Sequence, residues 1–159
     1  MGTVKGSISA RRAKADATRA RIVQAAYALF GELGYRATTM DLIAERAAVA
    51  VQTVYFVFRT KDDLLRAVHE WTVLGDHPTP PQQQDWHVAA LTEPDVARAL
   101  PKIIAGIATI NARIAPMVAV FHAVSQDPAG AIYQQSEELR RTGMAELVET
   151  LAKKTPLRK

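Results

Sequence analysis

The residue types that catalyse reactions or bind metals are few and scattered in this sequence. The chain contains no cysteine, and its four histidines, at positions 69, 77, 87 and 122, include no pair spaced three or four residues apart. A pair at that spacing would share one face of a helix, as helical metal-binding motifs require. No glycine-rich phosphate loop is present either. We therefore expect no catalytic residue, no metal and no cofactor, and we predict that the chain is not an enzyme.

A different chemistry is available around position 52, where three neighbouring side chains match the edges of DNA bases. Gln52 can form two hydrogen bonds with the N6 and N7 edge of adenine. Thr53 can donate to or accept from a base edge, and Val51 can contact the methyl group of thymine. These residues can read a DNA sequence only if a helix carries them outward, so the next question is which elements position them.

The N-terminal half of the chain contains no proline, and its apolar residues recur at helical spacing. A first amphipathic helix is predicted from Asp16 to Leu33. A second helix, from Met40 to Ala47, follows two threonines, Thr38 and Thr39, whose hydroxyls suit its N-terminal cap. Residues 60–63, Thr-Lys-Asp-Asp, have the form of a capping box and predict the start of a further helix.

The segment between these helices is ambiguous. Residues 49–58 are rich in β-branched and aromatic side chains, which by propensity favours a strand. A single strand among helices would leave its backbone N–H and C=O groups unpaired. We therefore predict a short helix from Val51 to Phe58, with Gln52, Thr53 and Tyr55 facing outward. Two short helices joined by about three residues form a helix-turn-helix.

The positive charge of the chain lies in its N-terminal half. The net charge is +4; residues 1–74 hold 11 basic and 7 acidic side chains, whereas residues 75–159 hold 9 of each. Within residues 1–36, 7 basic side chains face 2 acidic ones. A basic segment beside a helix-turn-helix is the electrostatic footprint of a protein that binds phosphate, although a solvated tail is the alternative. We predict a flexible basic arm over residues 1–15.

Residues 39–65, TMDLIAERAAVAVQTVYFVFRTKDDLL, resemble the DNA-binding domain of TetR-family transcriptional regulators. The resemblance extends upstream through the apolar pattern of the first helix and covers roughly residues 18–70. Two positions depart from the family pattern, because Ala48 replaces the usual turn glycine and Ala50 replaces the usual hydroxyl residue at the helix start. An alanine in a left-handed turn costs about 1 to 2 kcal/mol, and a missing hydroxyl cap costs about 1 kcal/mol.

The resemblance implies which side chains contact the DNA backbone. Tyr55 and Lys61 match family positions that usually contact phosphate, and Thr39, at a helix N-terminus with free amides, suits the same task. The resemblance also implies a bacterial-type homodimer on double-stranded DNA with a near-palindromic operator. The absence of cysteine fits a reducing compartment and the chain start does not resemble a signal peptide, so we expect a cytoplasmic protein. The base readers Val51, Gln52 and Thr53 complete the predicted DNA-binding set.

A second helical unit is predicted after a proline-rich and glutamine-rich linker. We place the helix-turn-helix domain at residues 16–74, the linker at 75–93 and the second unit at 94–159. Apolar residues from Val96 to Ile114 step by four and three, which predicts one long helix. The helices expected in this unit cover residues 94–113, 116–125 and 130–153. The whole chain is therefore predicted to be all-α.

The second unit has the composition of a binding domain. Three packed helices with isoleucine, valine, methionine and phenylalanine interiors can enclose an apolar cavity, although an ordinary core is the alternative for every side chain. In the TetR family this region binds a small molecule and adjoins the dimer interface, so the resemblance implies an unidentified ligand. The candidate ligand-binding residues are Trp86, Ile107, Asn111, Phe121, His122 and Tyr133.

No membrane partner is expected. The chain start is not followed by an apolar run, and the longest apolar stretch, residues 103–121, contains Asn111, Arg113 and Pro116, which a lipid-spanning helix does not readily carry. The chain is also short for the family, whose usual last two helices are missing, so the second unit is expected to be incomplete.

Two functions from different classes remain. The first is a repressor released from its operator by a small molecule. The alternative is a helical protein-interaction module whose basic arm binds a membrane surface or an acidic partner, without sequence-specific DNA binding.

Overall fold

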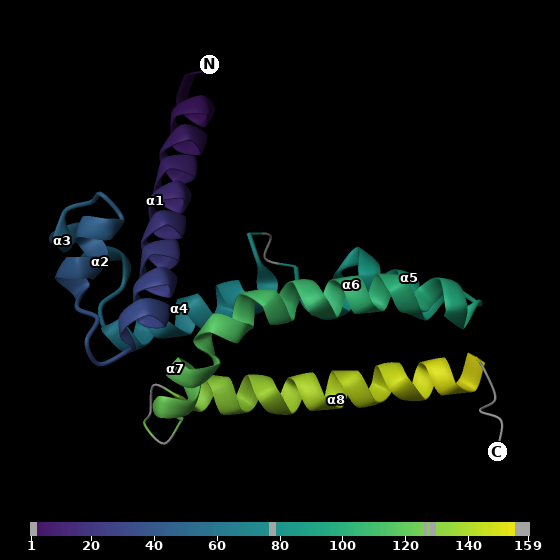
Figure 1. The fold of residues 1–159 in the computed structure, drawn as a ribbon. Helices are drawn as coiled ribbons and strands as arrows, with labels where there is room; N and C mark the ends of the chain where they lie inside the picture. Colours follow the sequence, from purple (N-terminus) through teal and green to yellow (C-terminus); the bar gives the residue numbers. More distant parts are fainter. Residues whose placement is uncertain (1–2, 77–78, 126, 128–129, 155–159) are drawn as a thin grey trace. The chain divides into compact units, whose positions relative to one another are not determined.

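The chain folds into helices, as predicted from the sequence. The computed structural model describes residues 3–76, 79–125, 127 and 130–154. Every regular element within these ranges is an α-helix or a short 3₁₀ helix (Figure 1). The elements are α1 (Thr3–Leu33), α2 (Met40–Arg46), α3 (Val51–Val57), α4 (Lys61–Leu74), η1 (Pro81–Gln83), α5 (Asp85–Thr92), α6 (Val96–Ile114), η2 (Ala115–Met117), α7 (Val118–Ala123) and α8 (Ala131–Lys154).

The chain divides into two compact units, Met1–Val68 and His69–Lys159. The division falls inside α4, whereas the sequence suggested a boundary after residue 74. Composition marks where a helix ends, but the division between compact units depends on which residues contact one another. One continuous helix therefore belongs to both units.

The predicted flexible arm is helical in its described part. Residues 3–15 continue α1 toward the N-terminus, and residues 1–2 lie outside the described residues. The segment contains no proline, and residues 10–15 are alanine, arginine and lysine, which have high helix propensity. A helix already nucleated downstream extends through such residues at little cost. The side chains of residues 10–15 are exposed.

Short helices in the first unit are fixed by burial and by caps. Thr39 caps α2, because its Oγ1 accepts a hydrogen bond from the Leu42 amide at 3.2 Å. Thr38 does not cap; its buried hydroxyl donates to the carbonyls of Leu29 and Gly34, at 3.1 and 2.9 Å, and so closes the end of α1. Buried apolar side chains of this unit include Ile22, Ala26, Phe30, Met40, Ile43, Ala44, Val54 and Phe58.

The turn between α2 and α3 contains both departures from the family pattern. Ala48 has a φ of 52°, in the left-handed region that normally favours glycine. Ala50 occupies the N-cap of α3 and makes no side-chain hydrogen bond to the helix. At the next helix, Thr60 does cap, since its Oγ1 accepts from the Asp63 amide at 3.0 Å and its hydroxyl donates to the Asp63 carboxylate at 2.8 Å.

The predicted linker over residues 75–93 is not a linker throughout, because α5 lies within it. Trp86 and Ala90 give α5 an apolar side, and Ala90 is fully buried against the second unit's core. In that core α5 packs with α6 and α8, and Figure 1 shows α5 lying along α6. Residues 79–80, just before η1, lie outside any helix, and residues 77–78 of the predicted linker lie outside the described residues. The core residues are Ala90, Ala99, Ile103 and Leu147, with Trp86, Ile107, Met144 and Leu151 packed against them.

Long cationic side chains close two helix ends in the second unit. The Lys154 ammonium donates to the carbonyls of Ala90, Leu91 and Glu93, at 3.0, 2.6 and 2.8 Å, at the end of α5. The Arg113 guanidinium donates to the carbonyls of Thr72 and Val73 at the end of α4, at 2.9 and 3.2 Å. A positive charge at a helix C-terminus also interacts favourably with the helix dipole.

One described segment, Val96–Ala123, is long and apolar enough to cross a membrane by length and composition alone. Core helices of soluble proteins pass the same test, and this segment contributes Ala99, Ile103 and Phe121 to the buried residues.

The turn geometry predicts that two substitutions stabilise the protein. Ala48→Gly relieves the left-handed strain, partly offset by the greater freedom of glycine in the unfolded chain, for a net gain of about 0.5 to 1 kcal/mol. Ala50→Ser supplies the missing cap and adds about 1 kcal/mol. Urea unfolding followed by circular dichroism measures both. As a control, Ala37→Gly, in an exposed turn without positive φ, is expected to lower stability slightly; a gain there equal to that at Ala48 would contradict the explanation.

Candidate nucleic-acid interface and ligand cavity

The outward face of α3 carries the predicted base-reading side chains. Gln52 is exposed and Tyr55 is 50% exposed, whereas Val51 and Thr53 are half-buried. Val54 is fully buried and Phe58, just after the helix, is 4% exposed. The structure thus presents Gln52 and Tyr55 to solvent and anchors the helix through its opposite face.

Phe56 belongs to the same exposed face and was missed by reasoning from the sequence. Its side chain is 89% exposed, and it lies one helical turn after Gln52. A phenylalanine can contact the methyl group of thymine in the major groove. The four-residue spacing from Gln52 was the available signal, but the β-branched and aromatic residues around Phe56 favoured a strand by propensity.

Lys61 has a structural role that the sequence did not indicate. Its ammonium donates to the carbonyls of Tyr35 and Thr38, both at 2.9 Å, and lies 4.3 Å from the centre of the Tyr35 ring. Partial burial lowers the pKa of Lys61. Two of its three N–H donors are therefore engaged within the first unit, and a phosphate contact by the third stays a prediction.

Thr39 is exposed at the start of α2. Its oxygen accepts from the Leu42 amide, so the hydroxyl hydrogen remains the group that would reach a phosphate.

The basic side chains of the first unit differ in how much they can offer to an anion. Arg46 forms an ion pair with Glu32 at 2.7 Å, and the Arg19 guanidinium lies over the Phe58 ring at 4.9 Å. The ion pair raises the pKa of Arg46 and lowers the pKa of Glu32 through their hydrogen bond. Other basic side chains are simply exposed: Arg11, Arg12, Lys14, Arg21, Arg36 and Arg59.

A cavity of about 320 Å³ lies in the second unit, among η1, α5, α6, α8 and the end of α4. Four of the six candidate ligand-binding residues line it, namely Trp86, Ile107, Asn111 and Tyr133. Its size is within the range of small-molecule sites, which is roughly 300 to 1,000 Å³.

Phe121 and His122 are not among the lining residues. Phe121 is buried and stacks on the Tyr133 ring, with centroids 5.2 Å apart, and His122 Nε2 lies 3.2 Å from the Tyr133 hydroxyl. Phe121 and His122 are consecutive residues near the end of α7. The sequence could not show that both contact Tyr133 and do not line the cavity, because this depends on the tertiary structure. Burial raises the pKa of Tyr133, which favours its neutral phenol.

Several polar groups of the lining were not predicted, and His69, Glu137 and Arg140 are among them. His69 is 5% exposed, and its ring meets the edges of Phe121 and Tyr133 at centroid distances of 5.1 and 6.0 Å. Burial lowers the pKa of His69, which favours its neutral form. Glu137 and Arg140 pair through hydrogen bonds of 3.0 and 2.9 Å, and this pairing lowers the pKa of Glu137. The i, i+3 spacing of these two residues was a signal that could have predicted the pair, but not its place at a cavity.

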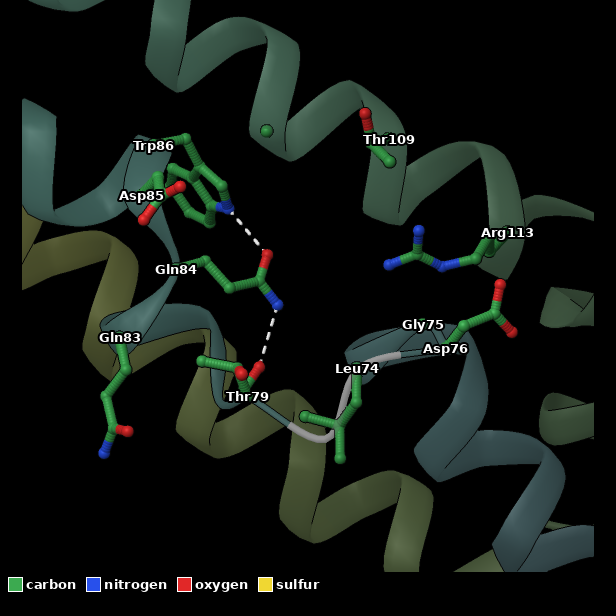
Figure 2. A pocket seen from close by; sticks show the side chains of 11 residues that line it. Leu74, Gly75, Asp76, Thr79, Gln83, Gln84, Asp85, Trp86, Thr109 and Arg113 are labelled. Carbon is green, nitrogen blue, oxygen red and sulfur yellow. Dashed lines mark hydrogen bonds between the residues drawn. The ribbon is translucent and has the colours of Figure 1, made fainter. Parts of the chain in front are cut away.

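The Trp86 indole forms a fixed wall of the cavity. Its Nε1 donates to the Gln84 side-chain oxygen at 2.9 Å, and the Gln84 amide donates to the Thr79 carbonyl at 2.9 Å (Figure 2). The ring packs on Gly106, where a Cβ atom would come within 2.2 Å of an indole carbon. Trp86 also lines a second, more open hollow of about 670 Å³, whose polar rim includes Arg113 (Figure 2).

Among residues 3–76, 79–125, 127 and 130–154, no three histidine, aspartate or glutamate side chains gather in an arrangement that could hold a metal ion.

Comparisons with known proteins connect the first unit to a family. The family described as "Bacterial regulatory proteins, tetR family" matches residues 22–68. Residues 22–68 therefore form a tetR-family domain within the first unit. A curated relative, the uncharacterized HTH-type transcriptional regulator YhgD of Bacillus subtilis (strain 168), is 46% identical over 43 residues. That alignment covers 27% of this chain and 22% of YhgD, so it spans about a fifth of the relative's length.

One solved structure extends the similarity of fold beyond the tetR-family domain. A variant of HlyIIR with one segment replaced by a linker containing two thrombin sites has a TM-score of 0.65 and 20% identity, covering 86% of this chain and 71% of that one. The multidrug binding protein EbrR, complexed with imidazole, has a TM-score of 0.43 and 22% identity, covering 88% and 69%. The HlyIIR match shows that the tetR-family domain and the second unit share a fold with that protein.

Lys61 is predicted to stabilise the tetR-family domain by binding two carbonyl groups. Lys61→Met keeps most of the aliphatic side chain and removes both charge-assisted hydrogen bonds, so we expect a loss of about 1 to 2 kcal/mol in urea unfolding. Lys14→Met, at an exposed position of α1, is the matched control and should change stability by less than about 0.5 kcal/mol. Equal effects of the two substitutions would show that the hydrogen bonds of Lys61 to the carbonyls of Tyr35 and Thr38 do not stabilise the domain.

His69 is predicted to make the second unit less stable in acid. Its pKa lies below the ordinary 6.5 in the folded state, so the unfolded chain binds the proton more readily, and stability falls as the pH drops through and below 6.5. The nearby Glu137 carboxylate opposes this shift without cancelling it.

Urea unfolding between pH 5 and 8 provides the test. His69→Phe should flatten the pH dependence, whereas His122→Gln, at an exposed histidine, should retain it. An unchanged slope in His69→Phe would show that another group is responsible.

Proposed function

We propose that this chain is a sequence-specific DNA-binding transcriptional regulator, acting in the cytoplasm as a repressor that a small molecule releases from a near-palindromic operator. The observation that carries the proposal is the exposed face of α3, with Gln52, Tyr55 and Phe56, in a domain that matches the tetR family. An exposed glutamine beside two exposed aromatic rings has no evident role in the core of this domain.

Base reading is assigned to the exposed and half-exposed side chains of α3. Gln52 would pair with adenine, Thr53 would bond a base edge, and Val51 and Phe56 would contact thymine methyl groups. Tyr55 and Thr39 would donate to phosphate oxygens and fix the orientation of the helix. Lys61, at the start of α4, would donate its third N–H to a phosphate oxygen, while its other two N–H groups bind backbone carbonyls.

Dimerisation and release follow from the geometry of the helix-turn-helix class. A homodimer would place two recognition helices in major grooves one turn apart, roughly 34 to 36 Å. The helix α4 runs from the first unit into the second, and its end is held by Arg113. A ligand in the second unit would favour one position of α4 and shift the population away from the spacing that fits DNA.

Two substitutions test the recognition helix. We expect Gln52→Ala to lose about 1 to 3 kcal/mol of discrimination at one base pair, and Tyr55→Phe to weaken all sequences alike, since phosphate contacts carry no sequence information. The measurement is a gel-shift titration on the inverted repeat upstream of the chain's own gene, at several fixed salt concentrations. Gln24→Ala, an exposed glutamine of α1, is the control. Unchanged binding by both α3 variants would refute the assignment.

A helical interaction module is the second candidate, and one observation favours it. Arg11, Arg12 and Lys14 are exposed on the part of α1 that lies outside the family match. Such a module would bind duplex DNA without sequence preference or not at all. A regulator shows both a sequence preference and a steep loss of affinity with salt, so the same titration separates the two.

A further inference from the structure

The lining of the 320 Å³ cavity is mainly apolar. Three isoleucines of α6, Ile107, Ile110 and Ile114, face Met144 and Leu147 of α8 across it. A cavity of about 320 Å³ is at the lower end of the range of small-molecule sites and has room for a molecule of a few rings. Apolar walls of this kind favour a guest that loses little hydration on entry.

The charged groups of the lining neutralise each other. Among the residues that the structure describes, Glu137 and Arg140 are the only aspartate, glutamate, lysine or arginine side chains that line the cavity, and they are paired with one another. The remaining polar side chains of the lining include uncharged amides and hydroxyls, and also histidines. One of these histidines, His69, is buried, and burial favours its neutral ring. A charged guest would therefore give up its hydration without meeting a free counter-charge.

Two aromatic side chains give the cavity flat surfaces. The Trp86 indole is held by Gln84 and by its close packing on Gly106. The Tyr133 ring is backed by Phe121, which stacks on it at an interplanar angle of 20°. Rings fixed in this way suit a planar guest, because stacking needs no reorganisation of the walls.

We propose that this cavity binds an uncharged, mainly apolar small molecule with planar rings, held against Trp86 and Tyr133. The inference rests on the proposed function, since it names the chemical class of the effector for the same site. The preference for an uncharged molecule arises because the charges of the lining are paired with each other. The preference for a planar molecule arises because the Trp86 indole packs flat where Gly106 has no side chain.

A pair of matched probes tests the charge selectivity on the unmodified full chain. N-phenyl-1-naphthylamine and 8-anilinonaphthalene-1-sulfonate carry the same rings, and only the second carries a negative charge. Fluorescence titration at constant salt is expected to give at least tenfold tighter binding of the uncharged probe. Equal or tighter binding of the sulfonate, or no saturable binding of the uncharged probe, overturns the proposal.

Matched variants locate the probe. Ile107→Trp fills the cavity and should weaken N-phenyl-1-naphthylamine at least tenfold, whereas Ile104→Trp, 62% exposed on the same helix, should leave its affinity unchanged. Gly106→Ala displaces the indole and should also weaken the probe. Equal effects of the two tryptophan substitutions, or unchanged probe affinity in Gly106→Ala, would overturn the location.

Failure of this inference is distinguishable from failure of the proposed function, because the probe titrations contain no DNA and the operator titrations contain no probe. Loss of probe selectivity with operator binding intact overturns the ligand class alone. Retained selectivity in a chain that shows no sequence preference for DNA supports the ligand class and overturns the regulator.

Discussion

Burial of Val54 and Phe58 is the constraint on which the first unit depends. Helices of seven residues are not stable alone in water, and both α2 and α3 have that length. The segment Val51–Val57 also has β-branched and aromatic side chains that disfavour a helix locally. Only packing of one face into the core holds it helical. The same packing turns Gln52, Tyr55 and Phe56 outward. The face of α3 that we propose to contact DNA bases is therefore set by which side chains are buried on the opposite face.

Several long cationic side chains donate hydrogen bonds to backbone carbonyls, and this affects how much of the positive charge is available to an external anion. Lys61, Arg113 and Lys154 each donate to two or more backbone carbonyls. Arg46 is paired with Glu32. The positive charge counted along the sequence therefore overstates what can meet phosphate. Exposed side chains such as Arg36 and Arg59 remain available for that role.

The two units differ in the chemistry they offer. The first exposes polar and aromatic groups on a helix surface, while the second encloses an apolar space in which Glu137 and Arg140 are already paired. A helix that belongs to both units, α4, is clasped at its start by contacts of Lys61 and at its end by Arg113. Because α4 is one continuous helix, it is the element through which the proposed ligand would influence DNA binding.

The sequence by itself determined the features that arise from local interactions. Helical spacing and caps such as Thr39 and Thr60 act within one or two turns, so the all-α fold, the helix-turn-helix and most helix limits could be predicted. Tertiary structure decided what depends on partners far along the chain. The Lys154 clasp joins residues more than sixty positions apart, α5 is helical where proline suggested a linker, and Phe121 lies behind Tyr133 instead of lining the cavity. Periodicity reports which face of a helix is apolar, but only packing decides which residues meet that face.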